Sequence, residues 1–328
     1  MEVKILTEAE LRGLVTVDDA AVSAVEKAFA WLAEDRAVMP PIMHIEVAEH
    51  SGDVDIKAAY VKGLPRFAVK IGAGFFGNEK RGLPSSPAMM VVLDARTGFA
   101  EAVLLDNAYL TDVRTGAAGA VAAKYLAPSH VTTAGVIGAG VQGRYQATAL
   151  AQVRTFERLL VYDMDQARLH RYVKEMGDKL FASVVPASGP EEVIRDSQAV
   201  VTCTPSRKPY IQAEWLHPGL HITAMGADLP EKQELSADAV ARADLLVCDR
   251  KSQSLAVGEF HHAAAAGLLS GASLVELGQI VAGKKSGRID DERITICDLS
   301  GTGVQDTAIA HLALELAAER DIGSPFAY

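Results

Sequence analysis

The chain has 328 residues, of which 49% are hydrophobic and 23% charged, and its formal net charge at pH 7 is −10. This length allows two domains and a large core. The acidic balance excludes nucleic acid as the main partner, because phosphate binding needs a concentrated basic surface. We expect no membrane partner, since no stretch reaches the ~18 apolar residues that a spanning helix needs.

The cysteines and the first residues bear on the compartment. Cys203, Cys248 and Cys297 lack CxxC spacing, and the first residues do not resemble a signal peptide. Both observations favour a cytoplasmic protein whose cysteines are small buried hydrophobic residues.

The N-terminal third predicts a helix and then a series of strands. The helix is expected over residues 16–37, with Thr16 and Asp19 in capping-box spacing. Strands are predicted at 54–61, 67–72, 89–94 and 101–106. Because the strands follow one another with short connections, they predict an antiparallel or mixed sheet.

The pattern changes near residue 111. A helix rich in small residues is predicted at 111–126, and short apolar strands then alternate with helical segments. The strands are predicted at 134–137, 159–162, 183–185, 199–203, 221–225, 245–248 and 294–297. This alternation predicts a parallel sheet with crossover helices. A last helix, at 305–320, is expected to return to the N-terminal domain.

A glycine-rich segment follows the first of the parallel strands. Gly138, Gly140 and Gly143 form a GxGxxG sequence that leads into a predicted helix. The three glycines would allow a tight turn, a close approach of the pyrophosphate and close packing of helix on strand, and the helix N-terminus attracts phosphate. The open alternatives are a glycine turn without a nucleotide, FAD and an S-adenosyl ligand.

An acidic residue at the end of the next strand bears on the choice of dinucleotide. Asp163 lies 25 positions after Gly138 and would accept hydrogen bonds from the adenosine ribose. It would also repel a 2′-phosphate, and the next two residues supply no arginine. The sequence therefore favours NAD, with NADP as the alternative.

The fold class that follows is α/β, with two domains. Residues 119–304 are predicted to form a Rossmann NAD-binding domain. Residues 1–118 together with 305–328 are predicted to form a discontinuous α+β domain for substrate binding and dimerisation.

Two cations are candidates for binding a substrate carboxylate. Lys70 lies on a predicted strand, and Arg114 lies near a helix N-terminus, where the helix dipole disfavours an unpaired cation. Arg and Lys are the side chains that recognise carboxylates. A solvated surface lysine and a salt bridge from Arg114 to Asp112 or another acid remain the alternatives.

Asp228 is the candidate acid and base. It follows the predicted strand at 221–225 and so lies at the carboxyl edge of the parallel sheet, where ligands bind in open α/β folds. An Asp there can exchange a proton with an amine or with attacking water. The alternative is a helix cap or turn. His261 and His262 are adjacent on a helix and point in different directions, so they predict no metal site.

Four segments in this order, together with the glycine fingerprint, resemble the ornithine cyclodeaminase/μ-crystallin family. They span residues 67–72, 111–118, 224–234 and 298–306. Within the family, the segments at 40–42, 53–57, 105–114 and 301–308 are most similar to ectoine-utilisation members. The resemblance implies a homodimer joined through the N-terminal domain and a small amino or imino acid as substrate.

The resemblance also implies roles for further residues. Asp228 would be the proton donor and acceptor, and Ser300 would face the substrate. Arg114, Met225 and Gly226 are also taken as cofactor contacts. The remaining cofactor contacts that the family implies are Ser85, Val141, Gln142, Thr204, Lys232 and Leu299.

One departure from the family concerns the carboxylate. The family often places an arginine where this chain has His44, and histidine cannot form the same bidentate fork. Carboxylate binding is therefore expected to depend on Lys70 and Arg114, or the substrate differs. Asp55 matches an acid near the reaction centre of ornithine cyclodeaminases. Lys57, on the same strand face, would bind a second acidic group or pair with Asp55 at the surface.

These residues predict an NAD(H)-dependent imine reductase or amino-acid dehydrogenase, in ectoine or related amino-acid catabolism. The first alternative is a cyclodeaminase, a lyase in which NAD first oxidises the amine and later returns the same hydride. The second is a non-catalytic binding protein like μ-crystallin. Net turnover of NADH separates the first two, because they use the same residues.

Overall fold

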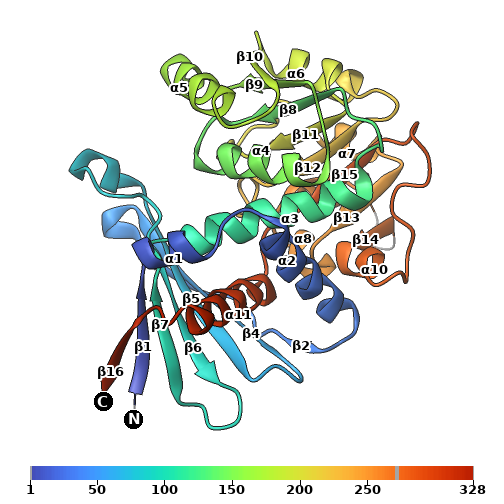
Figure 1. Ribbon diagram of the computed structural model, residues 1–328. Helices are drawn as coiled ribbons and strands as arrows, with labels where there is room; N and C mark the ends of the chain where they lie inside the picture. The colour runs from blue at the N-terminus through green and yellow to red at the C-terminus, as the bar shows by residue number, and fades with distance from the viewer. Residues whose placement is uncertain (1, 270–272, 328) are drawn as a thin grey trace. The chain divides into compact units, whose positions relative to one another are not determined.

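The computed structural model describes residues 2–269 and 273–327, and the chain divides into two compact units (Figure 1). The first unit comprises Met1–Arg114 and Thr302–Tyr328, and the second comprises Thr115–Gly301. The N-terminal part and the last helix thus belong to one unit. No described helix combines the length and the apolar character needed to cross a membrane.

The first unit is built on a mixed eight-stranded sheet in the order β16-β1-β7-β6-β5-β4-β2, with β3 paired to β4. Its strands are β1 (Glu2–Thr7), β2 (Ala37–Val38), β3 (Met43–Val47), β4 (Gly52–Val61), β5 (Arg66–Phe75), β6 (Ala88–Asp94), β7 (Ala100–Leu105) and β16 (Ser324–Ala327). The pair β1–β7 is parallel and the other pairs are antiparallel. The predicted mixed sheet is confirmed.

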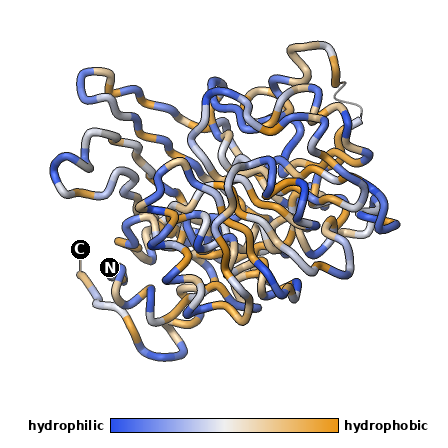
Figure 2. Tube along the Cα trace, turned by 90° about the horizontal axis from the view of Figure 1, so that it is seen from above, coloured by the Kyte–Doolittle hydropathy of each residue, from blue (hydrophilic) through white to orange (hydrophobic). Residues whose placement is uncertain are grey.

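The two ends of the chain lie side by side in both views (Figures 1 and 2), because β1 pairs antiparallel with β16. Neither strand was expected from the sequence. β16 is exposed along its whole length, so it lacks the inward apolar alternation by which a half-buried strand is recognised.

The helices of the first unit are α1 (Glu8–Leu14), α2 (Asp19–Ala33) and α11 (Gly303–Glu319). The expected capping box at Thr16 is wrong. Asp18 is the N-cap of α2, since its carboxylate accepts hydrogen bonds from the amides of Ala20 and Ala21, and the Thr16 hydroxyl donates to Asp18. The helix also ends at Ala33, four residues before the expected end at 37.

Helix α11 packs against β4 and β5 at very close range. The Thr307 hydroxyl donates to the carbonyl of Ala59 on β4 at 2.7 Å and accepts from the amide of Ala68 on β5 at 3.1 Å. At Gly303, a Cβ atom would lie 2.7 Å from the Ala58 carbonyl oxygen, so only glycine allows this approach. These contacts fix the first turns of α11 on the sheet.

The second unit contains an eight-stranded parallel sheet in the order β10-β9-β8-β11-β12-β15-β13-β14. Its strands are β8 (Thr133–Ile137), β9 (Arg158–Tyr162), β10 (Ser183–Pro186), β11 (Ala199–Thr202), β12 (His221–Ala224), β13 (Leu245–Cys248), β14 (Leu274–Glu276) and β15 (Thr295–Asp298). All seven predicted strands are present, and only the short β14 was not expected. The Rossmann-type α/β class is confirmed.

Helices connect these strands, as the alternating pattern predicts. They are α4 (Val141–Val153), α5 (Gln166–Gly177), α6 (Pro190–Asp196), α7 (Ala237–Ala241), α8 (Lys251–Ser254), α9 (Glu259–Ala265) and α10 (Leu277–Val281). Helix α3 (Tyr109–Leu126) begins in the first unit and continues into the second. The chain continues from β8 to its neighbour β9 on one side and from β11 to its neighbour β12 on the other, so the strand order reverses between β8 and β11. In open α/β folds, ligands bind at the carboxyl ends of the strands at such a point.

The three cysteines are free thiols, as expected, and Cys248 and Cys297 are fully buried. Burial raises the pKa of Cys203 and Cys297 well above the ordinary range. The thiolate is the reactive form of cysteine, so these side chains act as packing residues.

Candidate functional site

The glycine-rich loop lies between β8 and α4, at the carboxyl end of β8, where the strand order of the parallel sheet reverses. Gly138 has φ +109°, and a Cβ atom there would lie 2.9 Å from the Cys203 carbonyl oxygen. A Cβ atom at Gly143 would lie 2.1 Å from the Gly138 carbonyl oxygen. At Gly140 nothing lies within 4 Å of that position. The first and third glycines thus permit the turn and the packing, and the second leaves room for a ligand.

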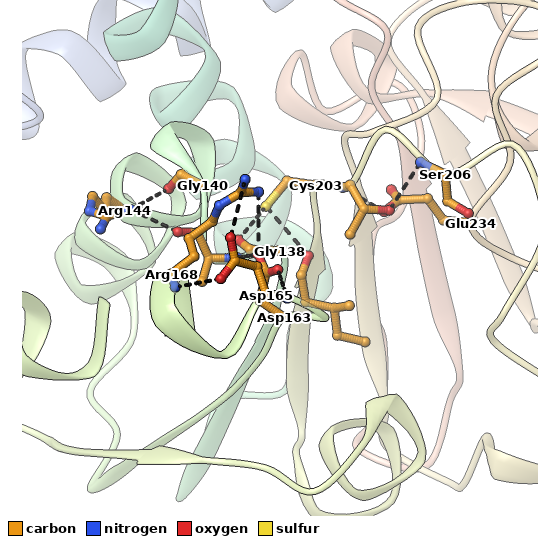
Figure 3. A network of polar contacts seen from close by, with 12 residues as sticks. Gly138, Gly140, Arg144, Asp163, Asp165, Arg168, Cys203, Ser206 and Glu234 are labelled. Carbon is orange, nitrogen blue, oxygen red and sulfur yellow. Dashed lines mark hydrogen bonds and ion pairs between the residues drawn. The ribbon is translucent and has the colours of Figure 1, made fainter. Parts of the chain in front are cut away.

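The N-terminus of α4 follows directly. Gly140 is its N-cap, and Val141, the first helical residue, is 58% exposed. The Arg144 guanidinium donates to the carbonyls of Ala139 and Gly140 at 2.8 and 2.9 Å, as Figure 3 shows for Gly140. Since Arg144 binds these two carbonyls, the loop is held in one conformation at a helix N-terminus. Backbone amides at such an end bind phosphate.

Asp163, at the end of β9, is bonded to this loop. Its carboxylate accepts hydrogen bonds from the amides of Ala139 at 2.9 Å and Asp165 at 2.8 Å. The expectation that no arginine lies near it needs correction, because Arg168 approaches Asp163 to 3.8 Å (Figure 3). Asp165 caps α5, and the first turn of that helix brings Arg168 back over the end of β9.

Glu234 was not expected from the sequence, yet its buried carboxylate joins the ends of β11 and β12. It accepts hydrogen bonds from the amide and hydroxyl of Thr204, at 2.8 and 2.7 Å, and from the Gly226 amide at 3.0 Å. The hydroxyls of Thr202 and Tyr210 also donate to it. Glu234 therefore fixes Thr204 and Gly226, two of the residues that are predicted to contact the cofactor.

Asp228 lies in the loop after β12 and is 52% exposed. The Lys232 ammonium donates to its carboxylate at 2.6 Å. His262 Nε2 donates a hydrogen bond to the Lys232 carbonyl at 2.9 Å, and His261 Nδ1 lies 3.4 Å from the Leu255 carbonyl. No group of potential metal ligands occurs among the described residues. His262 thus acts structurally, and it supports the loop that carries Asp228.

Leu299 and Ser300 follow β15 and are both buried. The Leu299 amide donates to the Ala224 carbonyl at 3.0 Å. The Ser300 hydroxyl accepts from Gln253 at 2.9 Å and lies 3.3 Å from Asp249. In this conformation, the Ser300 side chain takes part in a buried network within the second unit. Met225, also in this region, donates its amide to Thr202.

In the first unit, Lys70, Arg114 and Asp306 form a buried cluster, called here the cationic cluster. The Lys70 ammonium lies 3.4 Å from Asp306, and Arg114 Nε lies 3.0 Å from it. The Arg114 guanidinium also donates to Gln305 at 3.0 Å. The alternative of a surface lysine is wrong, since Lys70 is only 5% exposed. Arg114 does form a salt bridge, as the alternative predicted, and its partner is Asp306.

The charges around the cationic cluster do not balance. Lys57 on β4 pairs in register with Lys70, and its charge lowers the pKa of both Lys70 and Asp306. Asp106, buried at the end of β7, is the second acid, and burial raises its pKa to about 6. Three cations, of which Lys57 is half-buried, therefore face two buried carboxyl groups.

His44, which takes the place of the family's arginine, pairs with Asp55 at the protein surface and does not belong to the cationic cluster. His44 Nδ1 lies 2.8 Å from the Asp55 carboxylate across β3 and β4, and this hydrogen bond raises the pKa of His44. Asp55 thus pairs with His44 in this structure. Ser85 is half-buried, and its carbonyl accepts from the Phe75 amide.

Comparison with known proteins identifies the family and the fold of the chain. The model of the ornithine cyclodeaminase/mu-crystallin family matches residues 1–321. A protein of Rhizobium meliloti that is provisionally named a dehydrogenase is 50% identical over 324 residues, covering 98% of each chain.

Two solved structures have the same fold over nearly the whole chain. An archaeal alanine dehydrogenase dimer with bound NAD matches with TM-score 0.93 and 36% identity, covering 100% of each chain. The Δ1-pyrroline-2-carboxylate reductase of Thermococcus litoralis, in complex with NADH and L-proline, matches with TM-score 0.92 and 31% identity. It covers 98% of this chain and 99% of its own.

Proposed function

Because the chain belongs to the ornithine cyclodeaminase/mu-crystallin family, we propose that it is an NAD(H)-dependent oxidoreductase acting on a small amino or imino acid. The reaction takes place at the α-carbon, in the manner of an imine reductase or an amino-acid dehydrogenase. The finer prediction of a role in ectoine catabolism rests on the resemblance alone.

The observation that carries the proposal is the excess of buried positive charge in the cationic cluster. Lys70 and Arg114 are both nearly inaccessible, and both contact the carboxylate of Asp306. A buried charge without compensation is costly, so a protein retains one where a ligand supplies the opposite charge. The carboxylate of an α-amino or α-imino acid supplies it, and the Arg fork and the Lys ammonium give it hydrogen bonds.

The second unit has the residues that a dinucleotide needs. Gly140 leaves space at the N-terminus of α4 for a pyrophosphate, and Asp163 offers carboxylate oxygens to ribose hydroxyls. Thr204, Gly226 and Leu299 follow strands β11, β12 and β15, at the same edge of the sheet. When bound, NAD(H) supplies or accepts the hydride at the α-carbon.

The chain's own side chains then have distinct tasks. Lys70 and Arg114 bind and orient the carboxylate of the substrate. Asp228 accepts a proton from the substrate nitrogen on oxidation and returns it on reduction. Its exposure allows exchange of that proton with water, and Lys232 holds the carboxylate by a hydrogen bond of 2.6 Å.

The cofactor preference gives a first test of the proposal. The protein is expected to bind NADH more tightly than NADPH, because Asp163 repels a 2′-phosphate and engages Arg168. Titration followed by NADH and NADPH fluorescence measures both affinities. Asp163→Ser is expected to reduce the difference between the affinities for NADH and NADPH, since the repulsion of the 2′-phosphate is lost and Arg168 becomes available to bind it.

Arg168 provides the control for that substitution. Adding Arg168→Gln to Asp163→Ser is expected to remove the gain in NADPH binding, whereas Arg171→Gln, on the same helix, leaves it unchanged. Equal or tighter binding of NADPH by the unsubstituted protein would contradict the assigned preference.

The assembly is expected to be a homodimer joined through the first unit. Strand β3 pairs with β4 and carries the exposed apolar side chains of Met43 and Ile45, and Phe326 on β16 is also exposed. Exposed apolar edge strands invite pairing with another chain. Sedimentation analysis at micromolar concentration is expected to show a dimer, and a monomer under those conditions would refute this expectation.

A further inference from the structure

Asp306 has no role in the scheme above, although it contacts both cations that bind the substrate. We propose that Asp306 is a positioning residue for the substrate carboxylate, which holds Lys70 and Arg114 together so that both present their donors to it. This inference rests on the proposed function and assigns a further residue to the same site.

The position of Asp306 on α11 is fixed by the contacts of its two sequence neighbours. The preceding residue, Gln305, accepts a hydrogen bond from Arg114 and closes the capping box with Thr302. The following residue, Thr307, bonds to β4 and β5. The Asp306 carboxylate is therefore held rigidly between Lys70 and Arg114, although the three residues are far apart in the sequence.

The geometry of these contacts leaves hydrogen-bonding capacity unused. Neither carboxylate oxygen of Asp306 makes a hydrogen bond of good geometry, and the buried Nε of Arg114 makes none either. The contacts at 3.4 and 3.0 Å are thus ion pairs that fix position without saturating the donors. Buried donors without acceptors are rare in folded proteins and call for an explanation. A substrate carboxylate beside Lys70 and Arg114 supplies an acceptor for the Arg114 guanidinium.

Asp306 also helps Lys70 to keep its proton, because its charge raises the pKa of Lys70 against the effect of burial. Burial lowers the pKa of Lys70 to about 8, Asp306 opposes this shift, and Arg114 and Lys57 add to it. The other groups that face Lys70 are Asp106, at the end of β7, and Met90, its apolar neighbour on β6. Loss of the Asp306 charge would therefore lower the Lys70 pKa further. The ammonium would then lose its proton near neutral pH, and with it the attraction for a carboxylate.

Only the protonated form of Lys70 attracts the substrate carboxylate, so KM is expected to rise when the pH rises through the pKa of Lys70. In the unsubstituted protein, KM for a 2-oxo acid with ammonium is expected to stay constant up to about pH 8 and to rise above it. In Asp306→Asn, KM is expected to be about tenfold higher or more at pH 7, and its rise is expected to begin at lower pH. The effect on kcat is expected to be smaller. Pyruvate is the first probe, replaced by whichever 2-oxo acid is turned over fastest.

The control variant is Glu315→Gln, an exposed acid on the same helix that pairs with His311. It is expected to leave KM and its pH profile unchanged. Asp306→Glu keeps the charge, so it is expected to restore the onset of the KM rise toward that of the unsubstituted protein. If Asp306→Asn does not fold, Asp306→Glu takes its place, because moving the carboxylate by one methylene is expected to raise KM.

A second readout needs no turnover. Lysines labelled with 13C at Cε are followed by NMR as a function of pH, and Lys70→Arg identifies the Lys70 signal. The chemical shift of this signal is expected to change with a midpoint near pH 8 in the unsubstituted protein and at lower pH in Asp306→Asn. An unchanged midpoint, or a folded variant with unchanged KM, overturns the inference. If the unsubstituted protein turns over no 2-oxo acid while the midpoint shifts as expected, the proposed function fails and the coupling of Asp306 to Lys70 stands.

Discussion

Asp228→Asn is expected to lower kcat by about 10²-fold or more and to leave NADH binding nearly intact. The reason is that asparagine keeps the shape of the side chain and its bond to Lys232 but cannot accept the proton of the substrate nitrogen. Steady-state kinetics at saturating substrate, together with fluorescence titration of NADH, separate the two effects.

The matched control is Glu231→Gln, an acid in the same loop that pairs with Arg207. It removes the same charge three residues away and is expected to keep kcat close to that of the unsubstituted protein. If Asp228→Asn retained more than about half of kcat, proton transfer by Asp228 would be excluded, since proton-transfer catalysis does not survive that change.

Lys70→Ala and Arg114→Ala are each expected to raise KM for the 2-oxo or imino acid by about tenfold or more. Removing a charged hydrogen-bond partner typically costs ~1.5–3 kcal/mol. If the carboxylate is held equally in the ground and transition states, the change appears in KM with a smaller effect on kcat. The exposed Lys62, in the turn between β4 and β5, provides the control substitution Lys62→Ala.

The changes in KM and kcat of Lys70→Ala and Arg114→Ala distinguish between possible roles of the two cations. A rise in KM together with a fall in kcat would mean that the anchor also aligns the α-carbon for hydride transfer. An unchanged KM in both folded variants would show that the excess charge of the cationic cluster serves another purpose than carboxylate binding.

The parallel sheet of the second unit was predictable because all of its strands except the short β14 carry their own signal in the sequence. Fully buried strands read as short apolar runs, and β8, β11 and β12 are buried throughout. The exposed β16, in contrast, depends on its pairing with β1, which joins the two ends of the chain. Such a long-range pairing leaves no local pattern in the sequence.

The residues of the candidate site also differ in whether the sequence around them carries a signal. Lys70, Arg114 and Asp228 could be chosen from chemistry and from their places on predicted elements. Asp306 and Glu234 were not chosen, because their importance lies in partners that only folding brings to them. Arg168 is a related case, because it lies five residues after Asp163 in the sequence and the first turn of α5 brings it back to that carboxylate.

The proposed reaction is net hydride transfer at the α-carbon of an imino or amino acid. The most direct measurement follows NADH absorbance with purified protein, a panel of 2-oxo acids, and ammonium or a primary amine. Stoichiometric oxidation of NADH with formation of the amino acid is the expected result. Release of ammonia from a diamino acid with no net change in NADH would identify a cyclodeaminase instead and contradict the claim.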